Sequence, residues 1–219
     1  FWIRGFRTGA VRTRYNRMTW NIPNVLTVLR LLAAPAVAVM FLYFHRPWAD
    51  WFALVLFVSA AVTDWFDGYL ARLWKQTTKL GTMLDPIADK AMVVIALAVI
   101  LGYSSMSPWL VLPATMILFR EVFVSGLREY LGDTAGTLKV TKLAKWKTTL
   151  QMVAIAVLFA QGVFEHYFGM SSMGMDEALV ADVLAGEEED LMGLRWKFQG
   201  MVISSHIGLW LLWLAAALT

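Results

Sequence analysis

The sequence of 219 residues contains no cysteine and few charged residues, which make up 16% of the chain. The absence of cysteine excludes disulfide bonds, thiolate metal ligands and cysteine nucleophiles. An average globular protein carries about 25% charged residues, so the low charge disfavours an ordinary soluble domain. Hydrophobic residues instead make up 59% of the chain, and the mean hydropathy is +0.60. The composition therefore predicts an integral membrane protein, and the length suits a single domain.

Six segments are long and apolar enough to cross a bilayer as helices, which takes about 20 residues each. They cover residues 25–44, 49–73, 86–104, 107–127, 148–168 and 197–217. The third and fourth are joined only by YSSMSP, residues 103–108, which predicts a tight turn outside the lipid. The sequence thus predicts an all-α integral membrane protein with six transmembrane helices.

Positive charge alternates from one link between segments to the next. Five arginines and no acidic residue occur in the first 18 residues, and the links after the second and fourth segments are also basic. The intervening links are nearly neutral or uncharged, and residues 169–196 carry seven acidic residues against Arg195. Because basic links stay on the cytoplasmic side of a membrane, this pattern places both termini in the cytoplasm.

The same pattern divides the chain into parts. Residues 1–20 are expected to form a basic arm on the inner membrane surface, where anionic lipids attract it. Residues 21–219 form the membrane domain, with 169–196 as an acidic insertion on the outer side. Within that insertion we expect a short helix and then the sequence GEEED, residues 186–190, as a solvated turn.

Four aspartates lie close together in TDWFDGYLARLWKQTTKLGTMLDPIADK, residues 63–90. Asp64 and Asp67 are three residues apart, and Asp85 and Asp89 are four apart. Each pair therefore shares one face of its helix. Asp64 lies roughly 22 Å along its helix, near the inner edge of the hydrocarbon core. The hairpin between the two helices predicts that all four carboxylates converge at the cytoplasmic membrane interface.

The electrostatics of such a cluster indicate what it binds. One aspartate at the centre of a bilayer costs about 2.5–3.5 kcal/mol, and four neighbouring carboxylates also repel one another. Protonation would relieve the repulsion, and so would bound divalent cations. Carboxylate oxygens suit hard ions such as Mg²⁺ or Mn²⁺. Two ions shared by four carboxylates would clamp an in-line phosphoryl displacement.

Single members of the cluster also have purely structural interpretations. Asp85 followed by Pro86 is typical of a helix start, with an N-cap and then proline at the first helical position. Asp64 could form an ion pair with Arg72, and a small residue such as Gly68 could serve close helix packing. None of these interpretations explains the whole pattern.

The complete spacing resembles the motif of the CDP-alcohol phosphotransferase family. It runs Asp64-x2-Asp67-Gly68-x2-Ala71-Arg72-x8-Gly81-x3-Asp85-x3-Asp89 and matches every fixed position and gap of that motif. Four stretches are also similar to one bacterial branch of the family: NIPNVLTVLRL, AAVTDWFDGYLAR, LDPIADK and REVFVSGLREY. The family's six-helix architecture agrees with the topology predicted from charge.

The resemblance implies an enzyme that uses two divalent ions, Mg²⁺ or Mn²⁺. The ion ligands would be Asp64, Asp67, Asp85 and Asp89, and Asp89 would also be the general base. The donor substrate of this branch is CDP-diacylglycerol. Contacts to it would come from Asn24, Thr27, Gly68, Ala71, Arg72 and Gly81.

The acceptor of this branch is sn-glycerol 3-phosphate, and the products would be phosphatidylglycerophosphate and CMP. A basic cluster near the cytoplasmic end of the fourth segment suits the acceptor phosphate. Its expected members are Arg120, Arg128, Lys139, Lys142 and Lys145. Arg120 stands out because it lies within an apolar helix. Glu121 is interpreted as a structural partner of these arginines, and Lys147 as part of the positive-inside bias.

The resemblance further implies a homodimer in the bacterial inner membrane, with no nucleic-acid partner. Three alternatives stay open. The same chemistry could use inositol phosphate or serine as acceptor. A membrane prenyltransferase also binds diphosphates through aspartates, but it would need a second Asp-rich helix. A cation transporter could use buried carboxylates, but residues 51–63 and 91–103, beyond the cluster, are almost wholly apolar.

Overall fold

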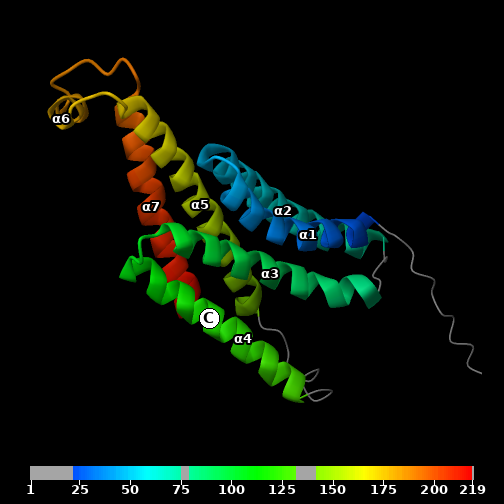
Figure 1. The fold of residues 1–219 in the computed structure, drawn as a ribbon. Helices are drawn as coiled ribbons and strands as arrows, with labels where there is room; N and C mark the ends of the chain where they lie inside the picture. The colour runs from blue at the N-terminus through cyan, green and yellow to red at the C-terminus, as the bar shows by residue number, and fades with distance from the viewer. Residues whose placement is uncertain (1–21, 75–78, 132–141, 219) are drawn as a thin grey trace, which may run out of the picture.

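The computed structural model describes residues 22–74, 79–131 and 142–218. Inside these ranges, the side chains at 22–23, 61, 64–74, 79–82, 128 and 142–145 fall outside the description. All secondary structure in the described residues is helical (Figure 1). The helices are α1 (Ile22–Tyr43), α2 (Arg46–Trp74), α3 (Lys79–Tyr103), α4 (Pro108–Leu131), α5 (Lys142–Ser172), α6 (Glu177–Ala185) and α7 (Leu194–Ala217).

Each of the six apolar segments of the sequence overlaps one of the six long helices, although α3 and α5 begin seven and six residues earlier than predicted. The short α6 lies in the acidic stretch, as predicted. Within the described residues, four helical stretches are long and apolar enough to cross a membrane. They are Asn24–Tyr43, Pro108–Leu131, Trp146–Ser172 and Leu194–Ala217. The described part of the chain is therefore all helical, and it contains four candidate membrane-spanning helices. Six spans and their orientation stay a prediction.

The link between α3 and α4 is the tight turn that the sequence predicts. Ser105 and Met106 adopt positive φ angles of 49° and 59°, which reverse the chain within a few residues. Ser107 O then accepts hydrogen bonds from the backbone N–H groups of Leu110 and Val111, at 3.0 and 2.9 Å. Pro108 occupies the first position of α4, where its missing N–H has no helical partner to lose.

The helices form two groups that cross each other (Figure 1). In the first group α1 packs against both α2 and α3, and in the second α5 packs along α7. Helix α5 also packs against α2, so it joins the groups. Five large side chains that are less than 2% exposed fill the core: Phe57, Met92, Leu97, Ile155 and Leu212. They come from α2, α3, α5 and α7, which makes the core common to both groups.

Two glycines of α7 allow its close contact with α5. A Cβ atom at Gly208 would lie 2.7 Å from Leu158 Cδ2, and one at Gly200 would lie 2.8 Å from Phe164 Cδ1. Real side chains do not approach so closely, so both positions require the absence of a side chain. Small residues at helix contacts are the usual means by which membrane helices pack.

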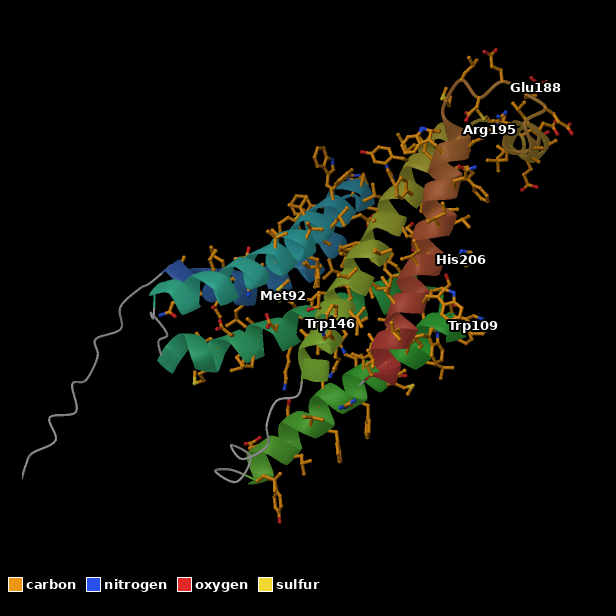
Figure 2. The ribbon with its side chains drawn as sticks, turned by 180° about the vertical axis from the view of Figure 1, so that it is seen from behind. Met92, Trp109, Trp146, Glu188, Arg195 and His206 are labelled. Atoms are coloured by element: carbon orange, nitrogen blue, oxygen red, sulfur yellow. The ribbon has the colours of Figure 1, made fainter. Side chains whose placement is uncertain are left out.

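The acidic stretch is ordered by its own capping interactions. Asp176 caps the start of α6 by accepting a hydrogen bond from Glu177 N, and Gly186 ends the helix with a φ of 96°. Arg195 closes the following turn, because its guanidinium donates to Val183 O at 2.6 Å and to Glu188 O at 2.9 Å. Figure 2 labels Glu188 and Arg195 at this end of the molecule. The sequence GEEED is an exposed turn, as predicted.

Helix α7 begins three residues before the predicted segment, and Asp190 binds N–H groups of its first turn. The Asp190 carboxylate accepts hydrogen bonds from Leu194 N at 2.7 Å and from Arg195 N at 3.0 Å. The hydrogen bond from Arg195 N, which favours the charged form, lowers the pKa of Asp190 below its ordinary value.

The interpretation of Asp85 and Pro86 as a helix start is wrong. Helix α3 begins at Lys79, and Pro86 lies inside it. Pro86 has no N–H to donate to the carbonyl of Thr82, so one hydrogen bond of the helix is lost there. Membrane helices tolerate such a loss where neighbouring helices support the backbone, and Pro35 and Pro113 lie inside α1 and α4 in the same way.

Candidate active site

The buried face of α1 is polar in its first half and apolar in its second. Asn24, Thr27 and Arg30 follow one another at three-residue spacing and are only 6%, 4% and 9% exposed. Ala34 and Val37 continue the same face and are also buried. A polar side chain that leaves water needs a partner, so the first half of α1 must meet polar groups of neighbouring helices.

Helix α3 supplies two of these polar groups. The Thr27 hydroxyl donates a hydrogen bond to Asp85 Oδ1. One turn further along both helices, Arg30 Nη1 lies 3.8 Å from Asp89 Oδ1. The parallel course of α1 and α3 matches the two residues of α1 to the two aspartates of α3. Asp85 is exposed and the Asp89 side chain is 25% exposed, so both carboxylates are accessible to a ligand.

Arg30 connects three helices through its guanidinium group. Besides the contact with Asp89 on α3, its Nη2 donates to the backbone oxygen of Ala60 on α2 at 3.4 Å. Ala60 lies four residues, or one helical turn, before Asp64. Arg30 therefore links the helix that carries Asp64 and Asp67 to the helix that carries Asp85 and Asp89.

Arg30 is not among the site residues predicted from the sequence. The signal was present, because an arginine inside an apolar segment is costly unless it has a specific partner. The same signal is the ground on which Arg120 is predicted to be a site residue. The partners of Arg30 lie 30 and 59 positions away along the chain, so only the packing of α1 on α2 and α3 identifies them.

Other predicted residues of the donor site lie at the adjoining ends of α2 and α3. Asp64, Asp67, Gly68, Ala71 and Arg72 fall on the last turns of α2, and Gly81 falls on the first turn of α3. Their side chains lie outside the described residues. Among the side chains that the structure does describe, no three histidine or acidic residues gather around one point. The convergence of all four carboxylates stays a prediction.

A second charged group joins α3, α4 and α5. Glu121 of α4 accepts a hydrogen bond from Lys147 of α5, and its other oxygen lies 4.0 Å from Lys90 Nζ of α3. Lys90 also donates to Ser125, whose hydroxyl donates to the backbone oxygen of Glu121 at 2.7 Å. The side chains of Glu121 and Lys147 are each only 14% exposed. Lys90 directly follows Asp89, so this group adjoins the carboxylates of α3.

This group corrects the interpretation of Glu121 and adds a contact for Lys147. Glu121 is paired with lysines from two other helices, whereas the sequence suggested the arginines of its own helix. Lys147 is in addition a mostly buried member of an ion pair, and its part in the positive-inside bias stays a prediction. Its partner lies 26 positions away, on a different helix.

The predicted acceptor residues lie on α4, α5 and the link between them. Arg120 is exposed on α4, and its Nη1 lies 3.5 Å from the backbone oxygen of Leu218, just after α7. The side chains of Arg128, at the end of α4, and of Lys142 and Lys145, at the start of α5, lie outside the description. Lys139 lies outside the described residues altogether. The acceptor site therefore stays a prediction.

The structure is a bundle of apolar helices, and one end of it carries Asp85, Asp89 and the buried Arg30. These features define a helical membrane protein with a polar site at one end of the bundle. The chain is a member of the CDP-alcohol phosphatidyltransferase family, whose family model matches residues 20–186. This match covers more than half of the chain and includes every residue of the aspartate motif. The family membership expected from that motif is thereby confirmed.

Three relatives are similar to most of the chain. A protein from Cereibacter sphaeroides is 65% identical over 202 residues, which cover 92% of this chain and 91% of the relative. A protein from Salmonella choleraesuis is 40% identical over 157 residues, covering 70% and 85%. One from Pectobacterium atrosepticum is 44% identical over 143 residues, covering 64% and 78%. All three are named CDP-diacylglycerol–glycerol-3-phosphate 3-phosphatidyltransferase.

Proposed function

We propose that this protein transfers the phosphatidyl group of CDP-diacylglycerol to sn-glycerol 3-phosphate, giving phosphatidylglycerophosphate and CMP. The choice of substrates rests on similarity to one relative. That relative is named for this reaction and is 65% identical over about nine-tenths of both chains. The observation that carries the location of the site is the set of contacts that Thr27 and Arg30 make with Asp85 and Asp89.

The reaction is a substitution at the phosphorus that carries the diacylglycerol group. The primary hydroxyl oxygen of glycerol 3-phosphate forms a bond to this phosphorus, and the bond from phosphorus to the CMP oxygen breaks. The electron pair of the broken bond leaves with CMP. Asp89 takes the proton of the attacking hydroxyl as general base, which requires its carboxylate to lie within hydrogen-bond reach of that oxygen.

Arg30 is proposed to position Asp89. Its contact with Asp89 Oδ1 at 3.8 Å and its hydrogen bond to Ala60 O leave the guanidinium little freedom. A planar group held from two helices restricts the rotamers of the carboxylate that it faces. Thr27 acts in the same way on Asp85, because the hydrogen bond engages Oδ1 and leaves Oδ2 available to a ligand.

The aspartates suit divalent ions. Asp85 and Asp89 present carboxylate oxygens, the donor type that Mg²⁺ and Mn²⁺ prefer, and both are accessible. We propose that Asp64, Asp67, Asp85 and Asp89 hold two such ions. When bound, the ions supply positive charge that offsets the diphosphate of the donor and the charge that develops on CMP.

The remaining predicted residues are proposed to bind the substrates. The proposed contacts to CDP-diacylglycerol are Asn24, Thr27, Gly68, Ala71, Arg72 and Gly81. The proposed contacts to the acceptor phosphate are Arg120, Arg128, Lys139, Lys142 and Lys145. Among the donor contacts, Gly68, Ala71 and Gly81 have no side chain or a small one and so leave room for the nucleotide. At the acceptor site, the positive charge of the arginines and lysines attracts the phosphate of the acceptor.

The location of the enzyme follows from its two substrates. One substrate is a lipid and the other dissolves in water, so a site at the cytoplasmic membrane interface serves both. We propose six membrane-spanning helices with both termini in the cytoplasm, in the inner membrane of a bacterium, and a homodimeric enzyme. Support for the spans comes from the alternation of charge between links and from the six long helices.

One assay tests the proposed function directly. Purified protein is incubated with CDP-diacylglycerol and Mg²⁺, and the release of CMP is measured with glycerol 3-phosphate, inositol phosphate or serine as acceptor. We expect release with glycerol 3-phosphate alone, and loss of release when the divalent ions are removed with EDTA. Release that depends on inositol phosphate or serine instead would contradict the proposed acceptor.

The role of Asp89 is tested in the same assay. Asp89→Asn removes the proton acceptor with little change of shape, so CMP release should fall at least 1,000-fold while the protein stays folded. Asp182→Asn, in the exposed part of α6, makes the same chemical change away from the site and should keep normal release. Near-normal turnover of Asp89→Asn would contradict its role as general base.

A further inference from the structure

The bundle contains a cavity at the end that lies away from the aspartate motif. Its volume is about 300 Å³, near the lower limit for ligand pockets. Asp50 lines it at the start of α2, 14 residues and so about 21 Å before Asp64. Tyr103 lines it at the end of α3, 14 residues after Asp89. The proposed reaction uses none of the residues around this cavity.

Three ionisable side chains meet in the wall of the cavity. Arg46 Nε lies 3.5 Å from Asp50 Oδ2, and Arg46 Nη2 lies 3.4 Å from Glu165 Oε2. Glu165 comes from α5, 119 positions after Arg46. One guanidinium therefore faces two carboxylates, and the wall carries one net negative charge when all three groups are ionised.

Asp50 is the buried member of this group. It is only 1% exposed, yet within the described residues its Oδ2 atom accepts no hydrogen bond and the neighbouring Arg46 Nε donates none. Burial of a charged oxygen without a hydrogen bond is costly, since the water that it loses is not replaced. Asp50 lines the cavity, so a donor that enters could supply the missing hydrogen bond once the carboxylate turns its shielded Oδ2 toward the cavity.

The rest of the lining is of two kinds. Hydroxyl and amide groups come from Ser104, Ser107, Ser205 and Gln161, and apolar side chains include Phe41, Ile100, Leu158, Phe159 and Leu209. Tyr103 holds Arg46 in place, because the guanidinium carbon lies 5.0 Å from the centre of its ring and its hydroxyl donates to Phe41 O at 3.0 Å. A ligand with a polar and an apolar part would match such a lining.

The charges indicate which ligand fits. The net negative charge and the acceptor oxygens of Asp50 and Glu165 favour a cation. A bare divalent ion fits poorly, because it needs at least six oxygen ligands and the Arg46 guanidinium already lies between the two carboxylates. An ammonium group has three N–H donors for carboxylate and hydroxyl oxygens. A phosphate beside that ammonium could reach Arg46, whose side chain is 35% exposed.

We propose that this cavity binds the headgroup of a membrane phospholipid that carries a primary ammonium. The ammonium donates to Asp50 and Glu165, the lipid phosphate contacts Arg46, and the apolar wall receives the start of the acyl chains. The site is separate from the transferase site and does not rest on the proposed function. It places a lipid sensor or structural lipid where the end of α1, the start of α2 and the end of α3 meet α5 and α7.

Binding of short-chain lipids tests the proposal. Native mass spectrometry of the purified full chain measures the dissociation constants of dihexanoyl phosphatidylethanolamine and dihexanoyl phosphatidylcholine. The choline headgroup has the same charges but no N–H donor. We expect the ethanolamine lipid to bind at least tenfold more tightly. Equal affinities of the two lipids would overturn the proposal.

Substitutions in the cavity wall test whether the lipid binds in this cavity. Glu165→Gln removes one carboxylate whose side chain is 48% exposed, so the protein should fold normally and bind the ethanolamine lipid at least fivefold more weakly. Asp50→Asn, at the buried position, should weaken binding further. The matched control is Glu187→Gln in the exposed acidic turn, which should leave the dissociation constant unchanged. Unaltered lipid binding by Glu165→Gln would overturn the proposal, whatever Asp50→Asn does.

A competition experiment distinguishes binding of a lipid from binding of a free amine. Ethanolamine alone carries the ammonium without the phosphate and the acyl chains, so it should compete at least 100-fold more weakly than the lipid. Competition at equal concentration would overturn the assignment to a lipid. None of these measurements needs turnover, so the transferase proposal could fail while this one stands, and the reverse.

Discussion

Replacement of Arg30 by glutamine tests whether this residue positions the general base. Arg30 Nη1 and Asp89 Oδ1 are 3.8 Å apart, and a pair of unit charges at such a distance corresponds to roughly 4 kcal/mol at an effective dielectric constant of 20. The Asp89 side chain is 25% exposed, so water replaces part of this energy when Arg30 is removed. We estimate the loss at about 1.5–3 kcal/mol.

This energy translates into an effect on turnover. Arg30 holds Asp89 in one orientation, so its removal lowers the fraction of enzyme in which the carboxylate reaches the acceptor hydroxyl. A loss of about 1.5–3 kcal/mol corresponds to roughly a 10- to 150-fold lower kcat. The KM for glycerol 3-phosphate should change less than about threefold, because Arg30 is not placed among the acceptor contacts. Arg30→Lys keeps the charge without the planar fork, so it should recover part of the loss.

The assay is CMP release over a range of glycerol 3-phosphate concentrations, together with the thermal unfolding of each variant. Arg195→Gln is the control, because it removes an arginine that donates to Val183 O and Glu188 O in the acidic stretch, away from the aspartate motif. Its kcat should stay within twofold of the wild type. A folded Arg30→Gln protein with a kcat within threefold of the wild type would refute the positioning role.

Three further predictions concern stability. Lys147→Met leaves Glu121 mostly buried with only a 4.0 Å contact to a lysine, so the free energy of unfolding should fall by about 1–3 kcal/mol in chemical denaturation. Gly208→Ala places a Cβ atom 2.7 Å from Leu158 Cδ2, and thermal unfolding should show a loss of about 1–3 kcal/mol; an unchanged midpoint would mean that α5 and α7 can separate at this point. The pKa of Asp190 is lower in the folded protein than in the unfolded chain, so its contribution to stability is present above the ordinary aspartate pKa of about 3.9 and disappears as the pH falls through the lowered value. The protection of the Leu194 amide against hydrogen exchange, relative to the intrinsic exchange rate at each pH, should therefore decrease at low pH, and Asp190→Asn should remove most of that pH dependence.

The sequence alone determined the helical elements and the aspartate motif. Long apolar runs predict helices from composition and length, which are local properties, and each of the six long helices overlaps a predicted segment. The turn at Ser105 and the short α6 were predictable for the same reason, because few residues outside each of them decide its conformation. The motif spacing between Asp64 and Asp89 indicated the family, which the match over residues 20–186 confirms.

The start of α3 shows where local signals fail. Asp85 followed by Pro86 has the pattern of a helix start, yet α3 begins at Lys79 and continues through the proline. The Thr27 hydroxyl engages Asp85 Oδ1, so the aspartate contacts α1, while it does not cap its own helix. A contact between two helices thus takes the place of the local interaction that the pattern suggests.

Only the tertiary structure decided which charged side chains meet. Arg30 contacts Asp89 and Ala60, Lys147 contacts Glu121, and Arg46 contacts Glu165 across 119 positions of the chain. No sequence spacing predicts such partners, because each contact depends on how two helices pack and on which faces they turn toward each other. In an apolar environment a buried charge is stable only beside a partner. A charged residue in an apolar segment of the sequence therefore indicates that a partner exists. Which residue that partner is depends on how the helices pack.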